Sequence, residues 1–271
     1  MAQVLRRLQP VSHPDLLVGA ATGDDAAVWR LDAQRALIAT VDFFTPLVDD
    51  PFTWGAIAAT NAASDVYAMG GRPLFALNIV AWPRERIPLE LLSDALAGAA
   101  EAAAGGGWLV VGGHTVDGEE PLIGQAVIGE VHPDEILTNS GARAGQSIVL
   151  TKPLGTGLIA TAVKRSSLDD VAPSGWLHAS YQAAVASMTR LNAAAAAAAR
   201  AAGATAATDI TGFGLIGHCQ RVAAESAVTI ELDADAVPRL AGIDGLIGAG
   251  YAPGGTDRNL DHFARHVDHA G

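Results

Sequence analysis

Cysteine is almost absent from this chain of 271 residues, and lysine is scarce. Cys219 is the only cysteine, which excludes an internal disulfide and a zinc site built from several thiolates. Lys152 and Lys164 are the only lysines, and the 17 basic residues face 29 aspartates and glutamates. The net charge of −12 argues against a nucleic-acid-binding surface and against an anionic membrane, because both partners require clustered positive charge.

Long apolar runs are also missing. No run of about 18 apolar residues is present to span a bilayer, and the alanine run 193–199 ends at Arg200. Residues 1–10 lack the apolar centre of a signal peptide, so we expect a cytoplasmic protein. Half of the residues are hydrophobic, which is typical of a chain that folds around a core.

The first half of the chain alternates strand-like and helix-like segments. Apolar runs rich in Val, Ile and Thr predict strands over residues 36–44, 74–82, 108–115 and 122–131. Two alanine-rich segments, 54–71 and 88–107, predict helices because both end at consecutive glycines and the second begins with a proline.

The second half repeats a strand, turn and helix order. Such units are predicted over residues 147–165 and 204–225, with one helix over 181–202 and a further strand over 227–237. A polar, glycine-containing passage, 137–146, predicts a boundary. We therefore expect an α/β fold, α+β-like in arrangement, with an N-terminal domain over 1–143. The C-terminal α/β domain over 144–271 lacks a closing strand and is expected to be incomplete at its C-terminus.

Four aspartates fall at functionally suggestive places. Asp25 precedes an apolar run, and Asp42 and Asp209 each end a predicted strand. Asp65 lies within a predicted helix four residues after Asn61, so both side chains leave the same face. Carboxylates at strand ends meet at the rim of a sheet and repel one another unless a cation such as Mg²⁺ lies between them. From the spacing alone, a metal-bound cluster and separate capping residues are both open interpretations.

Three glycine-containing segments are candidates for anion binding. Residues 110–115 are expected to follow a strand as a turn, and 152–158 and 209–218 are expected to open helices whose free N–H groups attract anions. None has the Gly-Lys-Ser/Thr ending of a P-loop, so an ordinary P-loop ATPase is excluded. For Cys219 and His218 we prefer buried packing or capping roles over those of nucleophile and base.

Several segments together resemble selenophosphate synthetase (selenide, water dikinase). They occur in order between residues 17 and 259: "GDDAAVW", "TVDFFTPLVDDPFTWGAIAATNAASDVYAMGGRPLFALNIVAWP", "GGHTVDGEEPLIGQAVIGEV", "LTKPLGTGLIATA", "TDITGFGLIGH" and "PGGTDRN". The "TVDFF" and "NAASDVYAMGG" blocks separate this family from aminoimidazole ribonucleotide synthetase, thiamine-monophosphate kinase and a hydrogenase-maturation protein, which share the "GDDAA"-like start.

The resemblance implies an ATP-dependent phosphotransferase that converts selenide and ATP into selenophosphate, AMP and phosphate. It also implies that Mg²⁺ holds the polyphosphate and that a homodimer forms through the N-terminal domain. The implied metal ligands are Asp25, Asp65 and Asp209. The implied ATP contacts are Thr22, Gly23, Asp24, Asp42, Asp65, Gly113, His114 and Thr115.

The chain also departs from the family pattern. The family carries a glycine-rich N-terminal segment with a reactive cysteine or selenocysteine, followed by a lysine that meets the phosphates. Met1 begins after the expected place of that segment, and neither Lys152 nor Lys164 replaces the lysine, so no catalytic residue is assigned. The family's closing segment has no counterpart before Gly271, and we expect a chain cut at both ends.

Two other functions are alternatives to that of a selenide, water dikinase. One is a related ATP-dependent small-molecule kinase of the same superfamily. The other is a nucleotide-binding regulatory subunit without catalytic activity.

Overall fold

A six-stranded sheet forms the first half of the molecule. The computed structural model describes residues 11–268, so the two ends at which truncation is expected, Met1 and Gly271, lie outside the described residues, as does the 1–10 segment. The sheet order is β1-β2-β3-β6-β4-β5, and every neighbouring pair is antiparallel except β4 and β5, which run parallel. The strands are β1 Leu16–Val18, β2 Ala27–Arg30, β3 Ala36–Phe44, β4 Arg72–Trp82, β5 Leu109–Asp117 and β6 Leu122–Val131.

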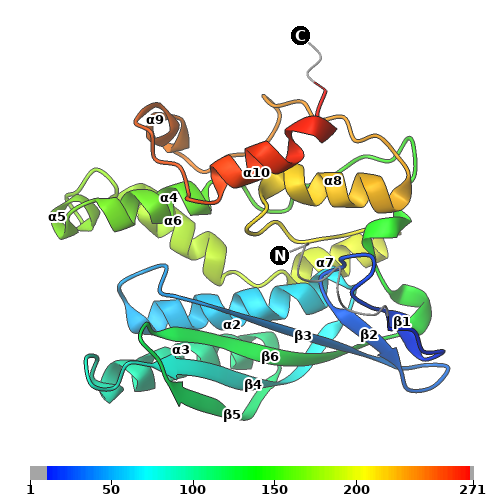
Figure 1. Cartoon of the computed structure of the whole chain (residues 1–271), viewed down its shortest axis with the longest axis horizontal. Helices are drawn as coiled ribbons and strands as arrows, with labels where there is room; N and C mark the ends of the chain where they lie inside the picture. Colours follow the sequence, from blue (N-terminus) through cyan, green and yellow to red (C-terminus); the bar gives the residue numbers. More distant parts are fainter. Residues whose placement is uncertain (1–10, 269–271) are drawn as a thin grey trace.

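Two long helices, α2 (Pro51–Ala68) and α3 (Leu89–Gly106), pack against the sheet (Figure 1). Helix α2 begins after Asp50, whose carboxylate accepts a hydrogen bond from the Thr53 N–H and so satisfies a free donor of the first turn. Helix α3 begins after Pro88 and ends at Gly107, whose φ of 79° lies in the left-handed region. The helices and strands predicted for this half are therefore confirmed within a few residues.

Buried alanines let α2 lie close to both the sheet and α3. Ala59, Ala62 and Ala63 of α2 are fully buried in a core that also holds Ile38 of β3 and Val127 of β6. In Figure 1, α2 lies between the sheet and the helices of the second half, so its residues reach both parts of the molecule.

Residues 110–115 carry two conflicting predictions, a strand over 108–115 and a glycine turn over 110–115; the strand is confirmed and the turn is wrong. Gly112 and Gly113 lie inside β5, where Gly113 pairs with Asn78 of β4. The segment continues as a strand because the parallel pairing with β4 extends through Asp117 and holds it in an extended conformation.

The second half is helical. Its helices are α4 Thr156–Arg165, α5 Leu168–Val171, α6 His178–Thr189, α7 Ala193–Ala201, α8 Gly214–Ser226, α9 Ile243–Gly248 and α10 Thr256–Phe263. Three short 3₁₀ turns also occur: η1 Pro133–Glu135, η2 Asn139–Gly141 and η3 Ala264–His266. Among the described residues, no helix is both long and apolar enough to cross a lipid bilayer.

The three strands predicted for the second half are wrong. Within residues 144–268 these segments run without ladders, and pairing is limited to the isolated bridges Thr138↔Ala206 and Leu154↔Arg239. A strand requires a neighbour that exchanges hydrogen bonds along its length, and a single bridge does not supply one. The α/β class of the whole molecule is confirmed by its sheet and helices.

The single helix predicted over 181–202 is also wrong, because the chain leaves helical geometry between α6 and α7. Arg190 is extended, with φ −74° and ψ 120°. Leu191 packs against the core beneath α2, and the Asn192 amide donates a 2.8 Å hydrogen bond to the Ser64 hydroxyl. Burial of Leu191 and the hydrogen bond of Asn192 override the helix propensity of the surrounding alanines.

The close packing of α2 on α3 makes a testable prediction. A Cβ added at Gly55 would lie 1.7 Å from the Ala95 carbonyl oxygen, so Gly55→Ala must push the helices apart. We expect a loss of about 1–3 kcal/mol in the free energy of unfolding. Gly105→Ala is the control because nothing lies within 4 Å of the added Cβ. It should be neutral or stabilising by up to about 1 kcal/mol. Equal melting temperatures for the two variants would contradict this packing.

Candidate active site

Four acidic side chains from distant parts of the sequence meet beside α2. Asp25 precedes β2, Asp42 lies on β3, Asp65 lies near the end of α2, and Asp209 precedes α8. We call these four residues the acidic cluster. Ligand atoms of Asp25, Asp209 and His218 lie within 4.8 Å of one another. Asp65 is close enough to Asp209, Asp25 and Asp42 for their charges to raise its pKa.

Neutral donors from neighbouring elements hold the carboxylates in place. The Thr40 hydroxyl of β3 donates a 2.5 Å hydrogen bond to Asp65 Oδ2, and the Asn61 amide of α2 donates to Asp42 Oδ2. Residues 40 and 42 lie on the same face of β3 because side chains alternate along a strand. Asn61 and Asp65 lie one turn apart on α2, as the sequence predicts.

Burial and mutual repulsion keep these carboxyl groups protonated at higher pH than usual. Burial raises the pKa of Asp25 to about 7, and repulsion from Asp209 and Asp24 adds to the effect. Burial raises the pKa of Asp65 to about 8, with repulsion from Asp209, Asp25 and Asp42. The pKa of Asp209 is raised by burial and by Asp42, although the Ser64 hydroxyl and the Lys152 ammonium oppose this. The cluster therefore favours a bound proton or a bound cation.

The acidic cluster has the chemistry of a Mg²⁺ site. Asp25 Oδ2 is buried and has no hydrogen-bond partner within residues 11–268, an arrangement that usually signals a missing ion or water. Mg²⁺ is a hard cation that prefers carboxylate oxygens. Asp25 and Asp209 bring carboxylate oxygens within 4.8 Å of each other, and Asp65 is close enough for its charge to couple to both, so the residues present fit the ion.

The loop before Asp25 lies beside the cluster. The Thr22 hydroxyl donates to Asp24 Oδ2, and Asp24 Oδ1 accepts a 2.6 Å hydrogen bond from the Asn139 N–H. The Asn139 amide in turn donates to the Gly23 carbonyl oxygen at 3.0 Å. Gly23 has φ 60°, a left-handed value that suits glycine, and the two residues after it have different partners: Asp24 bonds to the Asn139 N–H and Asp25 to the Thr208 hydroxyl. The structure thus brings Thr22, Gly23 and Asp24 next to the metal-binding candidates.

The other three predicted nucleotide contacts lie elsewhere in the same chain. Gly113, His114 and Thr115 are exposed on β5, at the end of the sheet order. Asp42 pairs with Gln125, which pairs with Asn78, which pairs with Gly113. At about 4.8 Å between neighbouring strands, this row separates Gly113 from Asp42 by roughly 14 Å. The structure does not bring these three residues to the acidic cluster.

Sequence reasoning missed Lys152 as a neighbour of the cluster. Its ammonium donates to the Arg190 carbonyl oxygen at the break between α6 and α7. Burial and the charge of Arg190 lower the pKa of Lys152 to about 8, while Asp209 opposes this shift. The sequence does not show this proximity, because it depends on the break between α6 and α7 that places the Arg190 carbonyl oxygen beside Lys152. That break arises from contacts with α2.

His218 and Cys219 lie in the second turn of α8. Burial lowers the pKa of the His218 imidazole, so the ring favours its neutral form. Burial raises the pKa of the Cys219 thiol, which is the opposite of what a reactive nucleophile needs. The structural role preferred for Cys219 therefore agrees with its environment, whereas His218 makes contacts with the cluster that the sequence did not predict.

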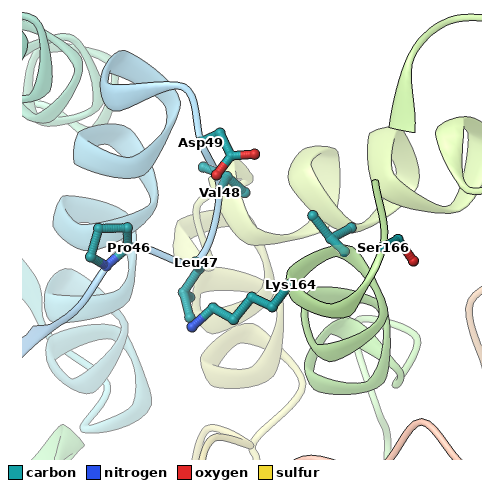
Figure 2. Close-up of a pocket in the computed structure, with 7 residues that line it drawn as sticks. Pro46, Leu47, Val48, Asp49, Lys164 and Ser166 are labelled. Atoms are coloured by element: carbon teal, nitrogen blue, oxygen red, sulfur yellow. The ribbon is translucent and has the colours of Figure 1, made fainter. Parts of the chain in front are cut away.

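A cavity of about 300 Å³ lies outside this site (Figure 2). It is lined by the loop 46–49 before α2 and by Val163, Lys164 and Ser166 at the end of α4. Figure 2 shows the Lys164 side chain extending toward Leu47. The cavity contains no predicted site residue, and the helical rise along α2 from Pro51, next to the cavity, to Asp65 is about 21 Å. The acidic cluster, and not this cavity, is the candidate active site.

Comparisons with known proteins agree with the motifs. Residues 23–131 match the family "AIR synthase related protein, N-terminal domain", and residues 143–250 match "AIR synthase related protein, C-terminal domain". A solved thiamine monophosphate kinase from Aquifex aeolicus has a TM-score of 0.69 at 20% identity, covering 87% of this chain and 78% of that chain. This likeness shows a shared fold.

Sequence identity is higher to selenide, water dikinases. The protein of that name from Geobacter metallireducens is 47% identical over 250 residues, which cover 92% of this chain and 71% of that relative. The one from Caldanaerobacter subterraneus is 47% identical over 267 residues, which cover 98% of this chain and 75% of that relative. The resemblance drawn from the motifs is confirmed, and the chain belongs to the selenide, water dikinase family.

Proposed function

We propose that this protein makes selenophosphate from selenide and ATP, with release of AMP and phosphate. The observation that carries the proposal is the acidic cluster, in a chain 47% identical to selenide, water dikinases over most of its length. A polyphosphate carries several negative charges, and a protein of net charge −12 requires divalent cations to bind it. The cluster provides oxygen ligands for such cations at one place.

In this proposal Asp25, Asp65 and Asp209 hold Mg²⁺. The bound ion supplies neutralisation of the polyphosphate charge and stabilises charge that develops on the transferred group. The chain's own residues orient the ligands, since Thr40 fixes Asp65 and Asn61 fixes Asp42 by hydrogen bonds. The proposed nucleotide contacts remain Thr22, Gly23, Asp24, Asp42, Asp65, Gly113, His114 and Thr115.

The proposed working form is a homodimer joined through the sheet. Side chains on the sheet face opposite α2 are apolar and exposed: Val41, Phe43, Phe75, Leu77 and Leu109. Exposed apolar patches of this kind mark protein–protein contacts. A second copy would cover them and would also explain why Gly113, His114 and Thr115 lie away from the acidic cluster of their own chain, if they contact nucleotide on the partner.

Two further assignments belong to this proposal. The chain divides into domains over 1–143 and 144–271, since the sheet and the helical half each have their own buried clusters. The protein works in the cytoplasm, where ATP is available.

The proposal predicts that ATP binding depends on Mg²⁺ and on Asp65. Asp65→Asn removes a carboxylate from the cluster, and we expect Mg²⁺–ATP affinity, measured by calorimetry, to fall by more than about tenfold. Asp94→Asn is the control, because Asp94 is an exposed aspartate on α3 far from the cluster. Unchanged affinity in Asp65→Asn would remove the basis of the assignment.

Product analysis then separates the proposed activity from that of a related kinase. Incubation with ATP, Mg²⁺ and selenide should release AMP and phosphate in a selenide-dependent manner, as measured by ³¹P NMR. Transfer of the γ-phosphoryl group to another small molecule, with release of ADP, would instead favour the small-molecule kinase. Mg²⁺-dependent binding without any hydrolysis would favour the regulatory subunit.

The raised pKa values predict how metal-free stability depends on pH. Asp25 and Asp65 have pKa values of about 7 and about 8 in the folded chain, against 3.8 as the ordinary value. The folded chain therefore holds protons that the unfolded chain has released, and its stability falls as the pH rises through this range. We expect the Tm in EDTA to decrease from about pH 6 to about pH 8 and Asp65→Asn to make the decrease shallower. A rising Tm in the metal-free protein would contradict the burial of these protons.

The homodimer predicts a change of mass in solution. Leu77→Glu places a charge on the exposed sheet face, so light scattering after size exclusion should show a monomer. Leu91→Glu is a matched control, since Leu91 on α3 is 40% exposed and Leu77 is 43% exposed. The control should stay dimeric like the unmodified protein. Dimeric Leu77→Glu, or a monomeric unmodified protein, would rule out this interface.

A further inference from the structure

A chain of hydrogen bonds ends on one oxygen of Asp25. The Thr211 backbone N–H donates to His218 Nε2 at 3.1 Å, and His218 Nδ1 lies 3.3 Å from the Thr208 hydroxyl. The same hydroxyl lies 3.0 Å from Asp25 Oδ1. Asp25 and Thr208 are 183 residues apart in sequence, so this contact joins the two halves of the molecule.

The donors and acceptors in this chain have one consistent direction. A backbone N–H can only donate, so Nε2 of His218 accepts, and the proton of the neutral ring is on Nδ1. Nδ1–H then donates to the Thr208 oxygen, which leaves the single hydroxyl proton of Thr208 for an acceptor. Asp25 Oδ1 at 3.0 Å is closer than the Asp209 carbonyl oxygen at 3.2 Å, and in the cation-binding form the Asp25 carboxylate is ionised and is the stronger acceptor.

The two carboxylate oxygens of Asp25 therefore have different environments. Oδ1 is held by Thr208, whereas Oδ2 is buried and has no partner within the described part of the chain. A carboxylate that is fixed through one oxygen presents the other in a defined direction, which is how groups behind a metal ligand set its orientation. His218 also ties the 208–211 segment to α8, next to Asp209.

We propose that His218 and Thr208 are positioning residues that orient Asp25 toward the divalent cation of the acidic cluster. This inference rests on the proposed function, because it takes Asp25 as a cation ligand. His218 is not itself assigned as a ligand, although its ring lies within 4.8 Å of Asp25 and Asp209 oxygens. Its Nε2 lone pair accepts the Thr211 N–H, and its Nδ1 carries a proton, so neither nitrogen offers a free lone pair.

The test compares two substitutions at Thr208 by their affinity for Mn²⁺, used alone as a probe for the Mg²⁺ site. Thr208→Val keeps the shape of the side chain but removes the hydroxyl, and Thr208→Ser keeps the hydroxyl. Electron paramagnetic resonance of free Mn²⁺ should show about 10–100-fold weaker binding in Thr208→Val and near-normal binding in Thr208→Ser. Thr161→Val is the control, because the Thr161 hydroxyl donates within α4 to the Gly157 carbonyl oxygen, and this variant should bind Mn²⁺ normally.

A second variant keeps the test independent of folding at residue 208. His218→Phe retains a ring of similar size but cannot donate to Thr208, and it should weaken Mn²⁺ binding in the same direction. Melting curves without metal identify any variant that is unfolded. Normal Mn²⁺ affinity in a folded Thr208→Val or His218→Phe protein would overturn the inference. Absence of Mn²⁺ binding to the unmodified protein would instead overturn the proposed function, which separates the two failures.

Discussion

Repulsion among buried carboxylates is the constraint on which the site depends. Asp25, Asp65 and Asp209 all have raised pKa values, because burial disfavours their charged forms and each feels the charge of another. Such a cluster is tolerated when it holds protons or a cation. The surrounding donors do not remove the repulsion; they fix the direction of each carboxylate. The folded chain therefore contains a centre whose charge is completed by a ligand.

Helix α2 is the element that makes this centre possible. Its small side chains let it approach the sheet and α3 closely, while its Asn61, Ser64 and Asp65 reach the region where the second half of the chain packs. The break between α6 and α7 lies at this meeting of α2 with the second half. Asn192 donates a hydrogen bond to Ser64 of α2, and Lys152 donates one to the Arg190 carbonyl oxygen. The strand residues supply one side of the site, and the segment before α8 supplies the other (Figure 1).

The two faces of the sheet differ in what covers them. One face is covered by α2 and α3, whereas the other presents apolar side chains to solvent. Strand alternation links these faces, since Thr40 and Asp42 point toward the site while Val41 and Phe43 point away from it. The proposed dimer contact and the proposed metal site are thus set by the same strand, β3, through its two sides.

The sequence by itself determined the elements whose signal is local. The apolar run 36–44 is β3, the alanine-rich segments are α2 and α3, and the four-residue spacing put Asn61 and Asp65 on one face. Apolar periodicity and the glycines and proline at helix ends depend on neighbouring residues alone, and the family motifs identified the aspartates. Only the tertiary structure decided the helix break at Arg190, the choice between strand and turn at Gly113, and the contacts of Lys152 and His218. These depend on partners as distant as the 183 residues between Asp25 and Thr208, and no local pattern encodes such a meeting.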